Sequence, residues 1–214
     1  MIRFPAALPS LPNTLCLEGL DFSGKSTQLE KLRHFHCPEG TVRRVLRNPH
    51  DGDVYQQSRA LFAAQAARSD ADQRVLGGIL LANHVSLIQT IQASPGTEWL
   101  LDRWWFSTVA YQGSQDPARG FGGWFSVLAT LEIPLPRTTI WLDTPVEVCL
   151  ERRAKRKQQE LYDDRDVAFY EKVRAGYQYL WDLGLFQDKI DTRGMTADDV
   201  YCCIVESLTG AFKT

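Results

Sequence analysis

Residues 19–26 have the spacing Gly-x-x-x-x-Gly-Lys-Ser, which constrains this chain more than any other feature in it. Glycines at this spacing let backbone N–H groups point into one concavity, and a helix beginning behind them adds its positive dipole. Such a loop cradles phosphate groups, with Lys25 reaching the β- and γ-phosphates and Ser26 ligating Mg²⁺. The expected phosphate-binding residues are Gly19, Leu20, Asp21, Phe22, Ser23, Gly24, Lys25, Ser26 and Thr27. A plain strand-to-helix turn is the alternative.

The flanking residues favour the phosphate loop over a plain turn. Leu15 and Leu17 precede it in a β-compatible run, and apolar residues at helical spacing follow it. Strand-like and helix-like segments then alternate to the end of the chain. The expected strands are 42–46, 99–103, 138–143 and 189–191; the expected helices include 54–68, 72–92, 124–131 and 197–208, with a loop over 113–123. This alternation predicts an α/β fold, a parallel sheet of the P-loop NTPase type with helices on both faces.

The length of 214 residues fits a single domain. Residues 1–13 are interrupted by Pro5, Pro9 and Pro12, so we expect an extended lead-in there, followed by one domain over 14–214. A net charge of −2 argues against general binding of nucleic acids or membrane surfaces. The five scattered cysteines predict neither disulfides nor a zinc site and suggest a reducing cytoplasm. No continuous apolar run approaches the ~18 residues of a membrane span.

Two further features suit phosphoryl transfer. Asp102 ends an apolar strand-like run, where it could hold Mg²⁺, and Arg103 beside it could bind an acceptor phosphate bidentately. A surface ion pair is the simpler interpretation. Residues 152–157 carry five cations in six positions and could form an arginine-bearing lid, at about 150–166, that closes over a triphosphate. A solvated helix face is the alternative there.

Three segments, in this order, resemble thymidylate kinases. They are Glu18–Thr27, the run Asp-Arg-Trp-Trp-Phe-Ser-Thr-Val-Ala-Tyr-Gln-Gly over 102–113, and Trp141–Glu147 followed by the basic block. The second segment is much more specific than a phosphate loop alone. The resemblance covers nearly everything from Thr14 to Leu208, and it implies a P-loop kinase domain that uses ATP and Mg²⁺ to convert dTMP to dTDP.

The resemblance also implies roles for individual residues. Asp21 matches an acid that contacts the 3′-hydroxyl of the acceptor sugar, and Arg103 matches an arginine on the acceptor phosphate. Arg47 and Arg59 match arginines beside that phosphate, and Ser107, Thr108, Tyr111 and Gln112 lie on the helix that lines base and sugar. The phosphate loop has no arginine of its own, so the resemblance places the catalytic arginine in the lid, with Arg153 and Arg156 as candidates. It also implies a homodimer.

One departure from the family pattern concerns the base. The family usually has Phe-x-Ala-x-Arg on the long helix, where this chain has Leu80, Ala82 and His84. Asn83 or His84 could still donate a hydrogen bond to a base carbonyl, or His84 could have no ligand role. The departure leaves the kinase prediction standing but makes a 5-substituted deoxyuridylate an alternative substrate. A deoxynucleoside kinase and a nucleotide-binding protein without turnover are separate alternatives, and the intact Lys25, Ser26 and Asp102 argue against the protein without turnover.

Overall fold

The computed structural model describes residues 8–35, 41–48, 70–155 and 165–210, with the side chains of 70–74 left aside. Five parallel strands form one sheet in the order β2-β3-β1-β4-β5. The strands are β1 (Ser10–Glu18), β2 (Val42–Arg47), β3 (Thr97–Asp102), β4 (Leu135–Asp143) and β5 (Asp188–Asp191). The predicted parallel α/β sheet is confirmed.

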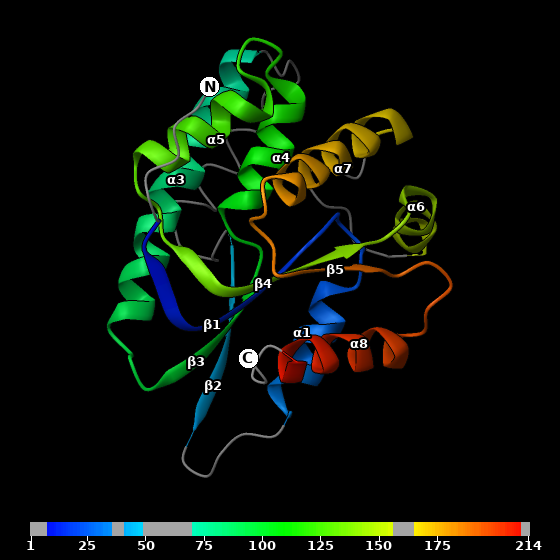
Figure 1. The fold of residues 1–214 in the computed structure, drawn as a ribbon. Coiled ribbons are helices and arrows are strands. Elements are labelled where there is room, and N and C mark those ends of the chain that lie inside the picture. Colours follow the sequence, from blue (N-terminus) through cyan, green and yellow to red (C-terminus); the bar gives the residue numbers. More distant parts are fainter. Residues whose placement is uncertain (1–7, 36–40, 49–69, 156–164, 211–214) are drawn as a thin grey trace.

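Helices cover both faces of this sheet (Figure 1). They are α1 (Lys25–Arg33), α3 (Asp70–Gln92), α4 (Trp105–Gln115), α5 (Gly120–Thr130), α6 (Val146–Ala154), α7 (Val167–Asp182) and α8 (Ala197–Gly210). In Figure 1, α3, α4, α5 and α7 lie above the sheet, and α1 and α8 lie below it. Two buried apolar clusters, one for each face, correspond to these two layers.

The central strand β1 shows how the sequence produces both layers. Successive side chains of a strand point to opposite faces. Leu15 and Leu17 accordingly join the cluster shared with α1 and α8, whereas Cys16 joins the cluster beneath α4 and α7. Because both faces are buried, the strand is apolar at consecutive positions rather than alternating. All the strands run parallel, so their carboxyl ends meet at one edge of the sheet.

Helices α4 and α7 cross very closely. A Cβ atom added at Gly176 of α7 would lie 2.7 Å from Cα of Ala110 and 2.9 Å from the ring of Phe121. Only a residue without a side chain permits this approach. The close crossing brings Tyr177, the next residue of α7, beneath α4 and toward the end of β1.

The structure differs from the sequence prediction at several boundaries. β1 begins at Ser10, inside the expected lead-in, and α4 and α5 occupy most of the expected loop over 113–123. The glycines there suggested a loop, but Gly113 is a packing site, since a Cβ at this position would lie 2.6 Å from the ring of Phe121. Asp116, fully buried, accepts hydrogen bonds from Arg119 and closes the short turn between the helices. The helix expected over 54–68 lies outside the described residues.

Helix α3 is more apolar than the sequence pattern indicated. Its residues Val75–Gln92 have a mean hydropathy of 1.3 over 18 residues, which meets the length and composition of a membrane span. Leu76, Leu87 and Ile91 are buried in the protein core, so this face of α3 is that of a core helix. Only 28 % of the window is buried in the monomer, however. The exposed residues of Val75–Gln92 include no charged side chain.

Candidate functional site

The loop between β1 and α1 has the backbone geometry of a phosphate cradle. Gly19 has φ 144°, and a Cβ there would lie 2.6 Å from the carbonyl oxygen of Leu142. Gly24 has φ 99° and caps α1 at its N-terminus. Phe22 also has a positive φ, 64°, a conformation that is costly for a residue with a side chain. Backbone strain of this kind is concentrated at functional sites.

Lys25 lies in the mouth of this loop and is almost entirely buried. Its Nζ donates hydrogen bonds to the carbonyl oxygens of Leu20 at 2.7 Å and Gly19 at 3.2 Å. Burial, helped by the nearby positive charge of Arg103, lowers the pKa of Lys25 to about 8. The ammonium group has no carboxylate at ion-pair distance among the described residues. It is thus a buried cation whose charge an anionic ligand could balance.

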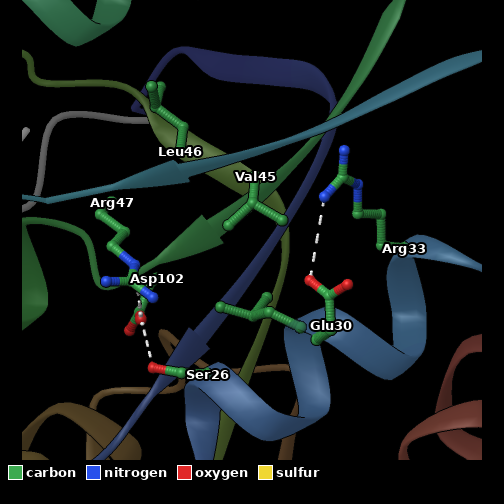
Figure 2. Close-up of a pocket in the computed structure, with 8 residues that line it drawn as sticks. Ser26, Glu30, Arg33, Val45, Leu46, Arg47 and Asp102 are labelled. Atoms are coloured by element: carbon green, nitrogen blue, oxygen red, sulfur yellow. Dashed lines mark hydrogen bonds and ion pairs between the residues drawn. The ribbon is translucent and has the colours of Figure 1, made fainter.

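Ser26 and Asp102 bring two oxygen ligands together on the α1 side of the loop. The Ser26 hydroxyl donates to Oδ2 of Asp102 at 3.1 Å (Figure 2). Arg47, at the end of β2, points toward the same carboxylate, with Nε 3.9 Å from Oδ2. These side chains border a cavity of about 290 Å³ that is lined by Ser26, Leu29, Glu30, Arg33, Val45, Leu46, Arg47 and Asp102. A hydroxyl and a carboxylate are a donor set that fits Mg²⁺, which keeps several waters and uses substrate phosphates as further ligands.

Arg103 is the centre of a second, buried polar cluster. Its backbone leaves β3 with φ 73°, and its N–H donates to the Leu17 carbonyl at 3.1 Å. Nη2 forms an ion pair with Oδ1 of Asp21 and lies 3.4 Å from the Tyr111 hydroxyl. Tyr111 in turn donates to Oδ2 of Asp21 at 2.8 Å. Arg103, Asp21 and Tyr111 therefore form one network that joins the phosphate loop to α4.

Electrostatics keep this network ionised. Burial raises the pKa of Asp21, but the charges of Arg103 and Lys25 and the Tyr111 hydrogen bond outweigh it, and the net pKa lies below its usual value. Burial also raises the pKa of Tyr111 well above its usual range, so its hydroxyl keeps its proton. The cluster therefore carries a permanent guanidinium charge beside a carboxylate that is a hydrogen-bond acceptor at neutral pH.

The residues expected around the base form a separate cluster between α3 and α4. His84 is fully buried, and burial lowers its pKa to about 3, so it is neutral. Its Nδ1 lies 3.0 Å from the Asn48 side-chain nitrogen and its Nε2 lies 3.5 Å from the Thr108 hydroxyl. Asn83 donates to Oδ1 of Asn48 at 3.1 Å. Neither amide atom of Gln112, also buried, has a hydrogen-bond partner in the part of the chain that the structure describes.

Two adjacent arginines at the start of the lid, Arg152 and Arg153, take different directions. Arg153 donates to the Arg165 carbonyl at 2.8 Å and lies over the Tyr170 ring. Arg152, which the sequence analysis did not select, donates to the Phe22 carbonyl at 3.1 Å and so lies over the phosphate loop. Adjacent residues on a helix point about 100° apart, so α6 can direct only one of this pair at the loop. Arg59 and Arg156 lie outside the described residues.

The structure thus brings most of the predicted residues to one edge of the sheet, in three clusters. The loop with Lys25, Ser26 and Asp102 forms the first; Asp21, Arg103, Ser107 and Tyr111 form the second; and His84, Thr108 and Gln112 belong to the third. Arg47 lies in the cavity of Figure 2 rather than in the Arg103 network. Glu18, Asn48 and Tyr177, which the sequence analysis did not select as site residues, also contact these clusters. The only local signal for Glu18 is its place directly before the first glycine.

Parallel sheets bind their ligands beyond the carboxyl ends of the strands. Here that edge offers a phosphate loop and, beside it, a second cationic centre. A kinase that acts on nucleotides brings two phosphate-bearing partners together in this way, so the fold and the site define a P-loop nucleoside monophosphate kinase. Comparison with known proteins identifies the family. The chain belongs to the thymidylate kinase family, whose sequence model matches residues 17–186.

Individual relatives agree with this assignment. A putative thymidylate kinase of Treponema pallidum is 31% identical over 178 residues, which is 80% of either chain. The thymidylate kinase of Geotalea daltonii is 28% identical over 209 residues, covering 92% of this chain and 96% of that protein. Among solved structures, thymidylate kinase from Candida albicans matches with a TM-score of 0.72 at 21% identity, over 92% of this chain and 91% of that one. The structural match independently supports the fold.

Proposed function

We propose that this protein transfers the γ-phosphoryl group of ATP to the 5′-phosphate of dTMP, giving dTDP and ADP. The observation that carries the proposal is the buried Arg103–Asp21 pair next to Lys25. Arg103 can bind an acceptor phosphate there, beside the loop that can bind the triphosphate of the donor. The family assignment favours this reaction over a deoxynucleoside kinase, over a 5-substituted deoxyuridylate as substrate and over a protein without turnover.

On the donor side, the backbone of residues 19–27 and the Lys25 ammonium group bind the β- and γ-phosphates. Ser26 and Asp102 would hold Mg²⁺, which would neutralise phosphate charge when bound. Phosphoryl transfer involves little covalent chemistry by the protein, so the residues act by positioning and by neutralising charge. Arg152 covers the loop, and Arg153 and Arg156 are the candidates for the catalytic arginine of a lid over about 150–166.

On the acceptor side, Arg103 binds the dTMP phosphate, with Arg47 and Arg59 as further cations. Asp21 accepts a hydrogen bond from the 3′-hydroxyl. A phosphate oxygen of dTMP attacks the γ-phosphorus while the bond to the β,γ-bridging oxygen breaks. Ser107, Thr108 and Tyr111 border the sugar and base. The unpaired Gln112 amide can pair with a thymine N–H and carbonyl, and His84 lies in the adjacent cluster.

The same proposal covers the setting of the enzyme. The chain from β1 onward, which begins at Ser10, acts as one kinase domain, and the protein works in the cytoplasm as a homodimer. The free, buried thiols of Cys16 and Cys149 support a reducing setting. An uncharged outer face of α3, described below, supports the dimer.

The test is a coupled assay of ADP release with ATP, Mg²⁺ and either dTMP, dUMP or thymidine. We expect dTMP to be the best of the three and thymidine to be a very poor substrate, because it lacks the phosphate that Arg103 binds. Lys25→Ala should lower kcat by ~10²-fold or more, since it removes a cation aimed at developing charge. Lys172→Ala, at an exposed position of α7, is the matched control. Preference for thymidine, or near-normal turnover by folded Lys25→Ala, would contradict the proposal.

A further inference from the structure

Glu18, the last residue of β1, is a buried carboxylate to which the proposed reaction gives no role. It is fully inaccessible to solvent, and both of its oxygens accept hydrogen bonds. Oε1 accepts from the backbone N–H of Trp104 at 2.6 Å, and Oε2 accepts from the hydroxyls of Ser107 at 2.6 Å and Tyr177 at 3.2 Å. Burying a carboxylate is costly unless such partners compensate it. These three donors come from the β3–α4 turn, α4 and α7, and the Cys16 thiol of β1 is a fourth, more distant donor at 3.9 Å from Oε1.

The same two hydroxyls also contact Arg103. Its Nη1 lies 3.0 Å from Oγ of Ser107, 2.9 Å from the hydroxyl oxygen of Tyr177 and 2.9 Å from the Gly19 carbonyl oxygen, so its two hydrogens are shared among these three acceptors. A hydroxyl has one hydrogen, and an ionised carboxylate can only accept. A hydroxyl that gives its hydrogen to Glu18 therefore presents its lone pairs to Arg103. Tyr177 can instead donate to the Gly19 carbonyl at 3.0 Å, so Ser107 is the more direct of the two bridges.

Glu18 also bears on the backbone of Arg103. That residue has a left-handed φ of 73°, which a side chain disfavours. Two hydrogen bonds hold this turn. The Arg103 N–H donates to the Leu17 carbonyl, and the next N–H, that of Trp104, donates to the Glu18 carboxylate. Consecutive residues of β1 thus fix consecutive N–H groups around the strained position.

We infer that Glu18 is a positioning residue for Arg103, acting through Ser107, Tyr177 and the Trp104 amide to set the guanidinium group for the acceptor phosphate. The inference rests on the proposed function. No direct ion pair joins Glu18 and Arg103 in the described part of the chain. The Glu18 carboxylate lies one hydroxyl away from the guanidinium group and acts on it through the Ser107 and Tyr177 hydroxyls that contact Nη1. Asp21, by contrast, pairs with Arg103 directly.

The test is a double-mutant cycle on Glu18 and Arg103, read as kcat/KM for dTMP. Glu18→Gln keeps the shape but turns an N–H₂ group toward a donor, so we expect a loss of about 10²-fold, as for a misplaced binding group. In an Arg103→Ala background, the same change should have little further effect, because the group it positions is gone. The affinity for ATP, measured by direct binding, should change by no more than about threefold in Glu18→Gln.

A control variant and a second test variant distinguish a positioning role from a structural one. Asp116→Asn removes another fully buried carboxylate, and it should lower the melting temperature while leaving kcat/KM for dTMP within about twofold. If Glu18→Gln does not fold, Tyr177→Phe removes one bridging hydroxyl and leaves the carboxylate in place. Tyr177→Phe should lower kcat/KM for dTMP in the wild-type background and have little effect in the Arg103→Ala background. A wild-type enzyme that does not phosphorylate dTMP would defeat the proposed function. An active wild type whose Glu18 and Arg103 effects simply add would defeat the positioning role.

Discussion

At the scale of single residues, the site combines buried charges that the protein leaves only partly compensated. Lys25 has carbonyl and hydroxyl partners but no ion pair among the residues described, and Asp21 and Arg103 form a pair that an incoming nucleotide could rearrange. Such a site favours the binding of a charged ligand, because the ligand supplies the ion-pair partner that the protein does not. The resulting change in protonation is measurable as proton uptake.

The expected proton uptake comes from Lys25. Burial holds its pKa at about 8, and the negative phosphates of ATP should raise it, because they favour the charged form. ATP binding at pH 8 should therefore take up roughly half a proton, falling toward zero at pH 6, where Lys25 is already charged. Calorimetric titrations in two buffers of different ionisation enthalpy measure this uptake. Lys25→Arg, which stays charged, should show none from this site, and equal uptake by the two proteins would contradict the assignment.

The residues of the site differ in how far the sequence could predict them. Lys25 and Ser26 follow from a contiguous motif, whose geometry is local. Asp102 and Arg103 could be selected because they end an apolar run, but their partners are 76 and 82 positions away in the chain. Glu18 and Tyr177 escaped selection because their role exists only where four elements meet. A buried hydrogen-bond relay has no sequence signal of its own.

At the scale of elements, α6 carries two adjacent arginines, Arg152 and Arg153, for which we expect different kinetic roles. Arg152 already lies on the phosphate loop, so Arg152→Ala should mainly raise the KM for ATP, by about tenfold. Arg153 is held by the Arg165 carbonyl and the Tyr170 ring, so it must leave them to reach the phosphates. Arg153→Ala should therefore lower kcat more than it raises that KM. Steady-state kinetics with varied ATP measure both, with exposed Lys172→Ala on α7 as the control. The opposite pattern would exchange the two roles.

The α4–α7 crossing gives a prediction of stability. Gly176→Ala puts a Cβ against the backbone of Ala110, which cannot move away without shifting the helix, so we expect a loss of ~1–3 kcal/mol in the free energy of unfolding. Gly210→Ala at the end of α8 is the matched control, because nothing lies within 4 Å of its added Cβ and alanine favours the helix. Urea unfolding measures both. A neutral Gly176→Ala would show that the crossing is not tightly packed.

The elements themselves were predictable where the sequence pattern is local. Strands β3 and β4 follow from short apolar runs, and α3 from apolar residues at helical spacing. The end of α4 and the start of α5 were not predicted, because Gly113 and Gly120 favour a loop on local grounds. Packing against Phe121 makes Gly113 helical instead. Tertiary contacts overrode local preference at this one place.

At the scale of the whole molecule, the sheet and its two helical layers bury most of the large apolar side chains of the described residues, whereas the outer face of α3 leaves apolar side chains exposed. The exposed positions there are Val75, Gly78, Ala82, Val85, Ser86 and Gln89, which recur at helical spacing and include no charge. Val75 and Val85 are 59% and 50% exposed. The sequence could not separate this face from the buried face of the same helix, since both are apolar.

An uncharged stripe of small and apolar residues suits close packing against the same helix of a second copy, because a twofold interface places one patch against itself. The wild-type protein should therefore sediment as a dimer at micromolar concentration. Val85→Lys would bury two unpaired ammonium groups at that interface, so the dissociation constant should rise by about 10²-fold or more. Val167→Lys, at a comparably exposed position on α7, is the control and should leave the dimer intact. Analytical ultracentrifugation distinguishes the two variants, and a dimer that survives Val85→Lys while dissociating in Val167→Lys would move the interface from α3 to α7.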